Sequence, residues 1–268
     1  MTRVAVVGHV EWVEFVRVRV SPPRGGLEQA TRLVEHAGGG AVVAATVLAQ
    51  LGAEVEFFCA LGDDERAARS ERELSDRGVT VHAARRSQPS RFVFTMLDDG
   101  GERTIVTVGE RLQPAGADPL PWERLADVDG VYFTAGDDQA LGCARRAERL
   151  VVTPRAGDHA AGLRAAPTVD ATVFSAHDTD EQRWAADWEP HSSVMVATEG
   201  ERGGRWWGAS TGRWTAVPPP GPIRDSYGCG DSFAAGLTFG LASGASIAEA
   251  AAVGARVGAE MLTRVGAP

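Results

Sequence analysis

Short apolar runs that end in a turn recur along the chain, and they predict buried strands. Residues 4–8 (VAVVG) and 55–62 (VEFFCALG) are two such runs, typical of strands that are covered on both faces. Four more strand-like runs follow at helix-length intervals: GVYFTAG, RLVVTPR, ATVFSAH and SSVMVATEG. Strands that alternate with helix-length segments indicate a mostly parallel α/β sheet.

Three segments have the pattern of helices. Residues 38–52 begin with three glycines and are then apolar all round, which predicts a buried helix and not an amphipathic surface one. Asp63 and Asp64 open a second helix that carries several charges. The run SIAEAAAVGARVGAEMLTRV opens with a capping box made by Ser246 and Glu249, which fixes the start of a third helix.

A second, smaller sheet is expected beside this core. Residues 12–20 (WVEFVRVRV) alternate in part between apolar and polar, like a strand with one exposed face. Residues 90–108 contain SRFVFTML and RTIVTV on either side of an Asp-Asp-Gly-Gly turn, which predicts a β-hairpin. We therefore expect one α/β domain over residues 1–268, with lid strands from about residues 10–22 and 88–110.

Two exposed elements raise the question of partners. The strand at residues 12–20 offers an edge through which two copies of the small sheet could pair into a homodimer. A further exposed hairpin is expected near the C-terminal third, where Trp206, Trp207 and Trp214 mark either an interface or the packing of an edge hairpin. The pattern alone does not decide between these two interpretations of the tryptophans.

The composition excludes several classes of site. The chain has no lysine, so its 27 basic residues are all arginine, and neither a Walker P-loop nor a Schiff-base lysine is available. The net charge of −9 argues against a sequence-independent grip on nucleic acid. The 3 cysteines are far apart and predict neither a metal site nor a disulfide framework. There is no membrane-length apolar run, and the start turns acidic at Glu11 before any signal-like core develops, so we expect a cytoplasmic protein.

The stretch IRDSYGCGDSFAAGLTFGL places two glycines and an acid at the mouth of a small-residue helix. Glycines let the backbone bend sharply and let a ligand come close, and a helix N-terminus holds an anion through its unsatisfied N–H groups and its dipole. An acid there can take a proton from a hydroxyl group that attacks the bound anion, as phosphoryl transfer requires. Asp231 could instead be only the N-cap of this helix, but its surroundings favour the catalytic interpretation.

The motif DSYGCGDSFAAG resembles the C-terminal signature of the ribokinase-like (pfkB) carbohydrate kinases, Asp-Thr-x-Gly-Ala-Gly-Asp before a small-residue helix. Here Ser226 stands in place of Thr and Cys229 in place of Ala. The stretch GGGAVVAATVLAQLGAEVEFFCALGDDE is similar to the family's glycine-rich N-terminal signature, and GERTIV and TEG fit as well. DTDE resembles the family's Asn-x-x-Glu, with Asp178 for Asn. The matches keep the family's order over nearly the whole chain.

This resemblance implies a Rossmann-like, mostly parallel central sheet flanked by helices, with a small β-sheet lid. It implies ATP-dependent phosphorylation of an alcohol group on a small molecule, a sugar or sugar-like compound. By the same resemblance, Asp231 is the catalytic base, and the backbone amides of Gly228, Cys229 and Gly230 form the anion hole. Arg155 falls where some members keep an arginine near the phosphates.

The resemblance also assigns residues to the cofactors. It implies that Glu181, with Asp178, organises Mg²⁺ through water, and that Thr198 and Gly200 line the ATP site. Asp225 is a further nucleotide-side residue, and with the C-terminal TRVGA region it lies where many members bind a monovalent cation such as K⁺.

The substrate end departs from the family. The first strand-to-lid turn usually carries an Asp where this chain has Val13, and the glycine motif usually leads to an Asn where Gly38 and Gly39 lead to Val43. A buried site that lacks its polar partners rejects a polyol, so we expect ribose and fructose to be poor substrates. The polar groups that we expect to hold the substrate instead are His9, Glu11 (or Glu14 with a shift in register) and Arg103.

Other functions stay open on the sequence alone. Within the kinase class, the acceptor could be a nucleoside or a vitamin-precursor alcohol. A catalytically weak ligand-binding or regulatory member of the fold is favoured by the missing substrate residues and disfavoured by the intact Gly-Cys-Gly-Asp. A nucleotide-dependent oxidoreductase is disfavoured because VAVVGH lacks a Gly-x-Gly-x-x-Gly turn. Cys229 is either a redox-sensitive thiol activated by the helix N-terminus or a small residue in the place of an alanine.

Overall fold

The computed structural model of the chain describes residues 1–99, 103–154, 167–264 and 266. Within these ranges, nine strands form one large sheet in the order β13-β12-β11-β10-β9-β8-β1-β4-β5. From β5 to β11 neighbouring strands run parallel, and β12 and β13 add an antiparallel edge, so the predicted mostly parallel sheet is confirmed. The strands are β1 (Arg3–Val7), β4 (Glu54–Gly62), β5 (Val79–Arg86), β8 (Gly130–Phe133), β9 (Arg149–Val152), β10 (Val169–Ser175), β11 (Ser192–Thr198), β12 (Gly204–Gly208) and β13 (Gly212–Trp214).

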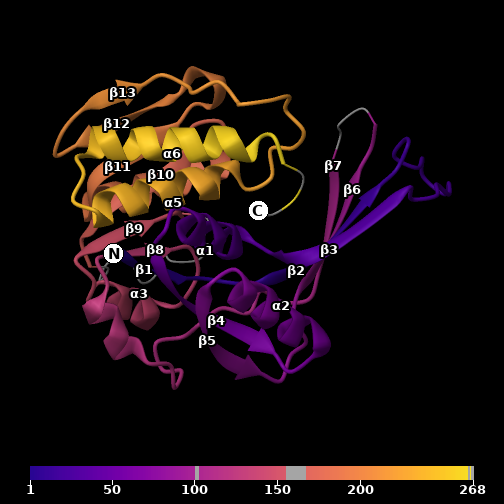
Figure 1. The fold of residues 1–268 in the computed structure, drawn as a ribbon, viewed down its shortest axis with the longest axis horizontal. Helices are drawn as coiled ribbons and strands as arrows, with labels where there is room; N and C mark the ends of the chain where they lie inside the picture. The colour runs from indigo at the N-terminus through magenta and orange to yellow at the C-terminus, as the bar shows by residue number, and fades with distance from the viewer. Residues whose placement is uncertain (100–102, 155–166, 265, 267–268) are drawn as a thin grey trace.

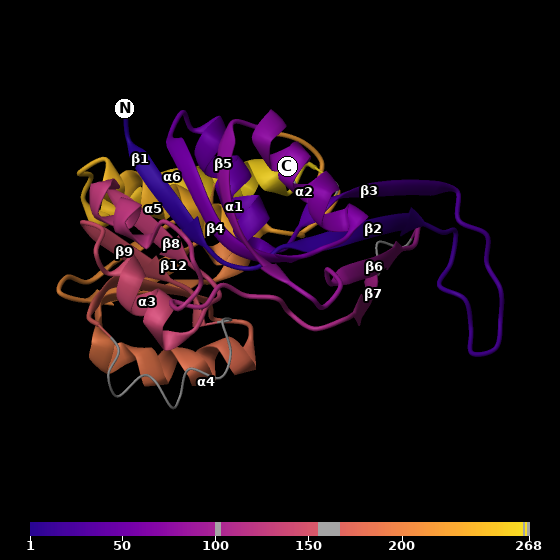
Figure 2. The same ribbon diagram turned by 90° about the horizontal axis from the view of Figure 1, so that it is seen from below.

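Helices cover both faces of this sheet, because its central strands are apolar on both sides. Val4 and Val6 of β1 pack into a core shared with α1, α5 and α6, whereas Ala5 and Val7 pack into a core shared with α3. Figure 2 shows α3 and α4 together on one side of the sheet. The helices are α1 (Gly40–Gln50), α2 (Glu65–Asp76), α3 (Asp138–Ala144), α4 (Thr179–Trp188), α5 (Cys229–Ala242) and α6 (Ile247–Met261), with short 3₁₀ turns η1 (Trp122–Asp127), η4 (Glu189–His191) and η5 (Gly200–Arg202).

The predicted helix starts agree with the observed ones. Residues 41–48 of α1 are all buried, as expected for a helix that is apolar all round. Asp64 caps α2 by accepting a hydrogen bond from the amide of Ala67 (2.9 Å), and α6 begins with the reciprocal capping box of Ser246 and Glu249. No helix in the described ranges has the length and apolar character needed to span a bilayer.

A separate four-stranded sheet, which we call the lid, extends away from the main body (Figure 1). Its order is β3-β2-β6-β7, with β2 (Glu11–Arg17), β3 (Arg32–Gly38), β6 (Phe92–Leu97) and β7 (Arg103–Val108). The strand predicted at residues 12–20 ends at Arg17, and the sequence analysis missed β3 and β5 altogether. Both missed strands carry charged residues and histidine, which interrupt the apolar alternation by which a strand is recognised.

The two faces of the lid sheet face different helices. On β2, Phe15 packs edge-on against Tyr227, which lies just before α5 (ring centroids 6.2 Å apart). The next side chain on the opposite face, Glu14, pairs with Arg66 of α2 (3.5 Å). Because side chains alternate along a strand, Glu11 and Val13 share the face of Phe15, and we call it the inner face of the lid.

The tryptophan hairpin is packed against the core and is not an exposed appendage. Trp206 is 8% exposed and stacks on Trp214 (6.3 Å), which in turn stacks on Phe233 of α5 (5.0 Å). The expectation of an exposed hairpin at these residues is therefore wrong. These two tryptophans join the edge of the sheet to α5.

The topology predicts where a ligand binds. Strand β1 lies between β4 and β8. The chain first adds β4 and β5 on one side of β1, and it later adds β8 and the strands that follow on the other side. In such sheets, ligands occupy the crevice beyond the carboxyl ends of the strands at this reversal point. His9 follows β1 at that end, and the carboxyl ends of β10 and β11 lie along the same edge.

Candidate active site

The first turn of α5 carries the acid singled out in the sequence. Gly228 precedes the helix in the left-handed conformation (φ 74°), which a glycine adopts without strain, and no side chain caps the helix. The amides of residues 228–230 therefore lie at the positive end of α5. Asp231 is 7% exposed, and its Oδ1 accepts a hydrogen bond from the hydroxyl of Tyr132 on β8 (3.2 Å). A carboxylate is thus fixed beside a helix N-terminus.

The glycines at the start of α1 make room for this acid. A side chain at Gly40 would collide with the carboxylate of Asp231, so only glycine fits there. Gly39, in the left-handed region at φ 92°, passes close to His9 and Glu11, where an added Cβ would lie 3.3 Å from His9 Nε2 and 3.5 Å from Glu11 Cγ. The two glycine-rich turns of the chain therefore meet at Asp231.

On one side of Asp231 lies a small cavity of about 20 Å³ that faces the carboxyl ends of β10 and β11. The lining includes Gly230, Glu181 and Thr198 in addition to Asp231. Glu181 is 3% exposed and accepts a hydrogen bond from the amide of Ser175 (2.7 Å). A buried carboxylate, a helix N-terminus and the base converge here, which is the donor set that a metal-bound phosphate chain needs.

The other residues assigned to the nucleotide and the metal are placed differently. Asp178 is exposed, and its Oδ1 caps α4 by accepting from the amides of Asp180 and Glu181 (both 3.0 Å). Gly200 begins the turn η5 at φ 59° and does not line the small cavity. Arg155 lies outside the described residues. Of the two predicted metal residues, Glu181 faces the site and Asp178 shapes the helix that carries it.

On the other side of Asp231, Glu11 opens β2 and points into the site. Its Oε1 lies 3.0 Å from Arg91 Nε and 3.7 Å from His9 Nε2. Burial raises the pKa of Glu11, an effect opposed by the charges of Arg91 and Arg111 and reinforced by the charge of Asp231. Glu11 is therefore close enough to Asp231 for the two carboxylates to interact.

The two valines at the substrate end are fully buried. Val13 is 0% exposed on the inner face of the lid, where it packs with Phe15 and Val93. Val43 is also 0% exposed, and its methyl groups support the turn at Gly228, where an added Cβ would lie 3.0 Å away. Neither valine offers a hydrogen bond to a ligand.

Arg103 reaches from β7 of the lid to the carboxylate of Asp225, six residues before the base. The side chain of Asp225 is 1% exposed and also accepts from the amides of Tyr227 (3.0 Å) and Gly266 (3.1 Å). Burial lowers the pKa of Arg103. The lid is thus joined to the anion-binding turn by a buried ion pair, and Asp225 does not line the small cavity.

The thiol of Cys229 is not activated. Burial raises its pKa to about 11, and the nearby charge of Arg103 only partly opposes this. A protonated thiol is a poor nucleophile, so the structure supports the small-residue interpretation of Cys229 over the redox one.

The sequence analysis missed Tyr132, Arg91 and Tyr227. Tyr132 lies in an apolar strand, and only the fold brings its hydroxyl to Asp231. Arg91 pairs with Glu11 because β6 lies beside β2, which no local pattern reveals. Tyr227 occupies the variable position of the glycine motif itself, and a large polar residue there was the one available signal.

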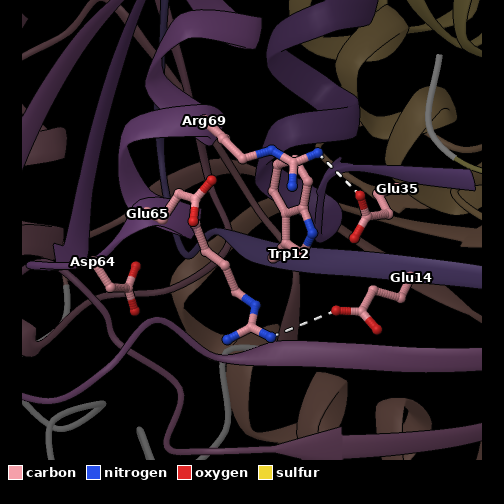
Figure 3. A pocket seen from close by; sticks show the side chains of 7 residues that line it. Trp12, Glu14, Glu35, Asp64, Glu65 and Arg69 are labelled. Atoms are coloured by element: carbon pink, nitrogen blue, oxygen red, sulfur yellow. Dashed lines mark hydrogen bonds and ion pairs between the residues drawn. The ribbon is translucent and has the colours of Figure 1, made fainter.

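A cavity of about 300 Å³ lies elsewhere, between the outer face of the lid and α2 (Figure 3). Figure 3 shows Arg69 lying over the ring of Trp12, 4.1 Å from its centroid, and paired with Glu35 (3.1 Å). Both arginines of this cavity already pair with glutamates of the lid, Arg66 with Glu14 and Arg69 with Glu35, and Asp64 is occupied as the cap of α2. This cavity joins the lid to α2 and contains none of the phosphoryl-transfer residues.

Comparison with known proteins bears on the family and the fold of the chain. The family model described as pfkB family carbohydrate kinase matches residues 1–268. The chain is 26% identical over 251 residues to the ATP-dependent ribose-1-phosphate kinase of Halopiger xanaduensis, a match that covers 88% of this chain and 84% of that protein.

Solved structures share the fold. The ribokinase of Arabidopsis thaliana, complexed with ribose and ATP, has a TM-score of 0.80 and 18% identity, with 100% of this chain and 95% of that chain covered. The phosphofructokinase-2 of Escherichia coli, in complex with potassium, has a TM-score of 0.77 and 18% identity, with 100% and 94% covered. At these identities, the likeness shows a common ribokinase-like architecture.

Proposed function

The chain belongs to the pfkB family of carbohydrate kinases, which are ATP-dependent enzymes, and from this premise we propose that it transfers the γ-phosphoryl group of ATP to an alcohol of a small, sugar-like acceptor. One observation carries the proposal: Asp231 is fixed beside the N-terminus of α5, between the small cavity that Glu181 lines and a second polar region around Glu11. A family member that had lost turnover would have no need to keep a base in this position.

In this reaction, Asp231 removes the proton of the acceptor hydroxyl as the acceptor oxygen forms a bond to the γ-phosphorus. The bond from that phosphorus to the bridging oxygen breaks, and ADP leaves. The amides of residues 228–230 and the dipole of α5 stabilise the charge on the transferring group. The hydroxyl of Tyr132 orients the carboxylate of Asp231 by donating to Oδ1.

Mg²⁺ is the expected partner of ATP, and Glu181 suits it better than Asp178. No group of three or more His, Cys, Asp or Glu side chains with metal-binding geometry is found in the described part of the chain. Magnesium in phosphoryl-transfer sites commonly keeps its waters and uses one or two carboxylates together with substrate phosphates. Glu181 would hold such an ion through water, and the ion would neutralise charge on the phosphates.

A monovalent cation is less well supported. The carboxylate of Asp225, expected near such a cation, is neutralised by the guanidinium of Arg103. We infer that turnover does not depend on added K⁺, because a positive charge from the lid already lies at this position.

The acceptor side favours a molecule that carries a negative group. Arg91 and Arg111 lower the cost of charge on Glu11, and Arg103, paired with Asp225, approaches the ring of Tyr227, so three arginines lie near a region with few hydroxyl-binding side chains. The relative from Halopiger is named for ribose 1-phosphate. A phosphorylated sugar is therefore a second candidate acceptor beside a neutral, weakly hydroxylated alcohol.

The expected pairing edge at residues 12–20 is wrong, because β2 lies between β3 and β6 and has no free edge. The edge strand β7 supports a homodimer instead. Ile105, Val106 and Val108 of β7 are 48%, 52% and 43% exposed at the edge of the lid sheet. Apolar side chains on a free edge strand favour pairing with a second copy. Light scattering after gel filtration would show a dimer in the wild type and a monomer for Val106→Glu, whereas a wild-type monomer would contradict pairing.

The test of the activity is an acceptor panel. Purified protein with Mg-ATP would be assayed for ADP release with sugars, sugar acids, sugar phosphates, nucleosides and pyrimidine alcohols, and each product would be identified by mass. We expect at least one acceptor to gain one phosphoryl group, with ribose and fructose poor substrates. Failure of every acceptor to raise ADP release above the no-acceptor rate would contradict the proposal.

A further inference from the structure

The hydroxyl of Tyr227 lies where the anion-binding turn meets the acceptor glycines. Tyr227 Oη accepts a hydrogen bond from the amide of Gly39 (2.9 Å), and it would lie 3.0 Å from a Cβ added at Gly38. The ring contacts Phe15 edge-on, and Arg103 lies 5.9 Å from the ring centroid. One side chain therefore touches the lid, the start of α1 and the approach to α5.

The chemistry of this hydroxyl suits it to bind an acceptor. Burial raises the pKa of Tyr227, and the nearby carboxylates of Glu11 and Asp231 raise it further, so the group stays protonated at neutral pH. Its lone pair accepts from Gly39, and within the described residues we find no hydrogen bond in which the hydroxyl donates. A buried tyrosine hydroxyl normally has a partner for its proton.

The hydroxyl of Tyr227 lies on the side of the site where the family's polar acceptor-binding side chains are missing. Val13 and Val43 stand where the family carries a carboxylate and an amide, and both are buried without offering a hydrogen bond. Glu11 supplies an acceptor group on the lid side. A donor is still required, and the Tyr227 hydroxyl is a neutral donor held by Gly39, the glycine that passes close to Glu11.

We propose that Tyr227 is an acceptor-binding and specificity-determining residue: its hydroxyl donates to an oxygen of the bound acceptor, and its ring limits the size of the acceptor that fits beside Gly39 and Asp231. This inference rests on the proposed kinase function and names the residue that selects the acceptor. Tyr227 and Glu11 supply one donor and one carboxylate at other positions, while Val13 and Val43 stay apolar, so a compound with few free hydroxyls is preferred over a polyol.

The first experiment compares Tyr227→Phe with the wild type on the best acceptor of the panel. Loss of the hydroxyl should lower kcat/KM for the acceptor by about 10-fold to 100-fold, mostly through KM, because one hydrogen bond to the ligand is removed. KM for ATP should stay unchanged, and the melting temperature should fall by about 2–4 °C, because the amide of Gly39 loses the oxygen to which it donates. Tyr227→Ser should shift the preference toward larger acceptors, because the space of the ring becomes available.

The other tyrosine provides a matched control. The chain has 2 tyrosines, and Tyr132 donates to the base. Tyr132→Phe should lower kcat and leave the acceptor KM nearly unchanged, the opposite pattern from Tyr227→Phe. Wild-type kcat/KM in Tyr227→Phe, or a loss that lies in kcat and leaves the acceptor KM unchanged as in Tyr132→Phe, would overturn the inference.

A second measurement separates this inference from the kinase activity. Protein labelled with ¹³C at the tyrosine ζ carbon gives two resonances, and Tyr227→Phe assigns them. Titration with D-ribose 1-phosphate, D-ribose and the best acceptor, without ATP, should shift the Tyr227 resonance more than that of Tyr132.

The outcomes of that titration are distinct. Phosphorylation of a compound that leaves the Tyr227 resonance unmoved at saturation would overturn the role of Tyr227 and leave the kinase function standing. A shift of Tyr227 by compounds that are never phosphorylated would support the binding role and contradict phosphoryl transfer. If no compound is phosphorylated and none shifts the resonance, both proposals fail.

Discussion

Asp231 lies between two regions that, in the proposed reaction, would hold their ligands by different means. On the proposed phosphate side, the binding groups would be backbone amides of residues 228–230, aided by the buried carboxylate of Glu181. On the proposed acceptor side, they would be side chains from separate segments: Glu11, Tyr227 and the lid arginines. Backbone groups can be used only where glycines allow close approach, so the phosphate side is tied to a fixed sequence, whereas the acceptor side can be rebuilt residue by residue.

The largest expected effect lies at the boundary between the two regions. Asp231→Asn should lower kcat by at least about 100-fold, the usual range for a general base, while ATP binding and the melting temperature are retained. Steady-state kinetics and calorimetric titration of ATP would check this. Near-wild-type turnover by Asp231→Asn would show that Asp231 is not the base. The division of the site into a phosphate side and an acceptor side would then lose its support.

The second-largest expected effect tests whether Glu181 binds Mg²⁺ on the phosphate side. Glu181→Gln should raise the Mg²⁺ concentration for half-maximal activity by about 10-fold, because a carboxylate that binds the ion through water is replaced by a neutral amide. Asp178→Asn serves as the control, because Asn is also a good cap and Asp178 caps α4 away from the cavity. Equal Mg²⁺ titrations for Glu181→Gln and the wild type would exclude Glu181 from the metal site.

Arg103 tests whether the lid acts on the anion-binding turn. Arg103→Met leaves the buried carboxylate of Asp225 without its charged partner, and we expect kcat/KM to fall by about 10-fold. Added K⁺ should restore part of this loss and have little effect on the wild type. Arg69→Met, at the ion pair on the outer face of the lid, should keep near-wild-type activity (Figure 3). Strong K⁺ dependence of the wild type would contradict the role given to Arg103.

The smallest effect concerns stability and pH on the acceptor side. The pKa of Glu11 is raised by burial in the folded protein, so the ionised carboxylate costs stability as pH rises above its ordinary value of 4.5. Glu11→Gln removes this cost and should raise the melting temperature at neutral pH by about 2–4 °C, with no gain at acidic pH where Glu11 is protonated. Acceptor KM should rise in the same variant. A gain that is equal at acidic and neutral pH would show that the charge of Glu11 is not responsible.

The phosphate side is easier to predict from the sequence than the acceptor side, because its residues are continuous in the chain. The turn at Gly228 and the acid at 231 form one continuous stretch, so the phosphate side and the buried helix α1 could be recognised from local pattern alone. Glu11 was identified from its place on the strand-to-lid turn. The ion pair of Arg91 with Glu11 and the contact of Tyr227 with Gly39 join segments that are far apart in the chain, and they exist only because β2, β6 and α1 fold together.

Two strands were missed because their patterns are mixed. In β3, Glu35 and His36 interrupt the apolar alternation; Glu35 pairs with Arg69 on the outer face, and His36 is buried against Phe15 on the inner face. In β5, His82 pairs with Glu56 of the neighbouring strand β4 (2.9 Å), so the polar side chain of His82 has a partner within the sheet. Tertiary pairing of this kind cannot be read from local periodicity.

The central claim is that Asp231 directs the γ-phosphoryl group from ATP to an acceptor alcohol and not to water. ATP labelled with ¹⁸O at the γ-phosphate, incubated with the enzyme and its best acceptor, tests this directly by ³¹P NMR of the products. We predict a phosphate monoester in which the labelled non-bridging oxygens have moved with phosphorus and the bridging oxygen is the unlabelled one of the acceptor, at a rate lowered by at least about 100-fold in Asp231→Asn. Formation of inorganic phosphate alone, or of the ester at an equal rate in both proteins, would contradict the account.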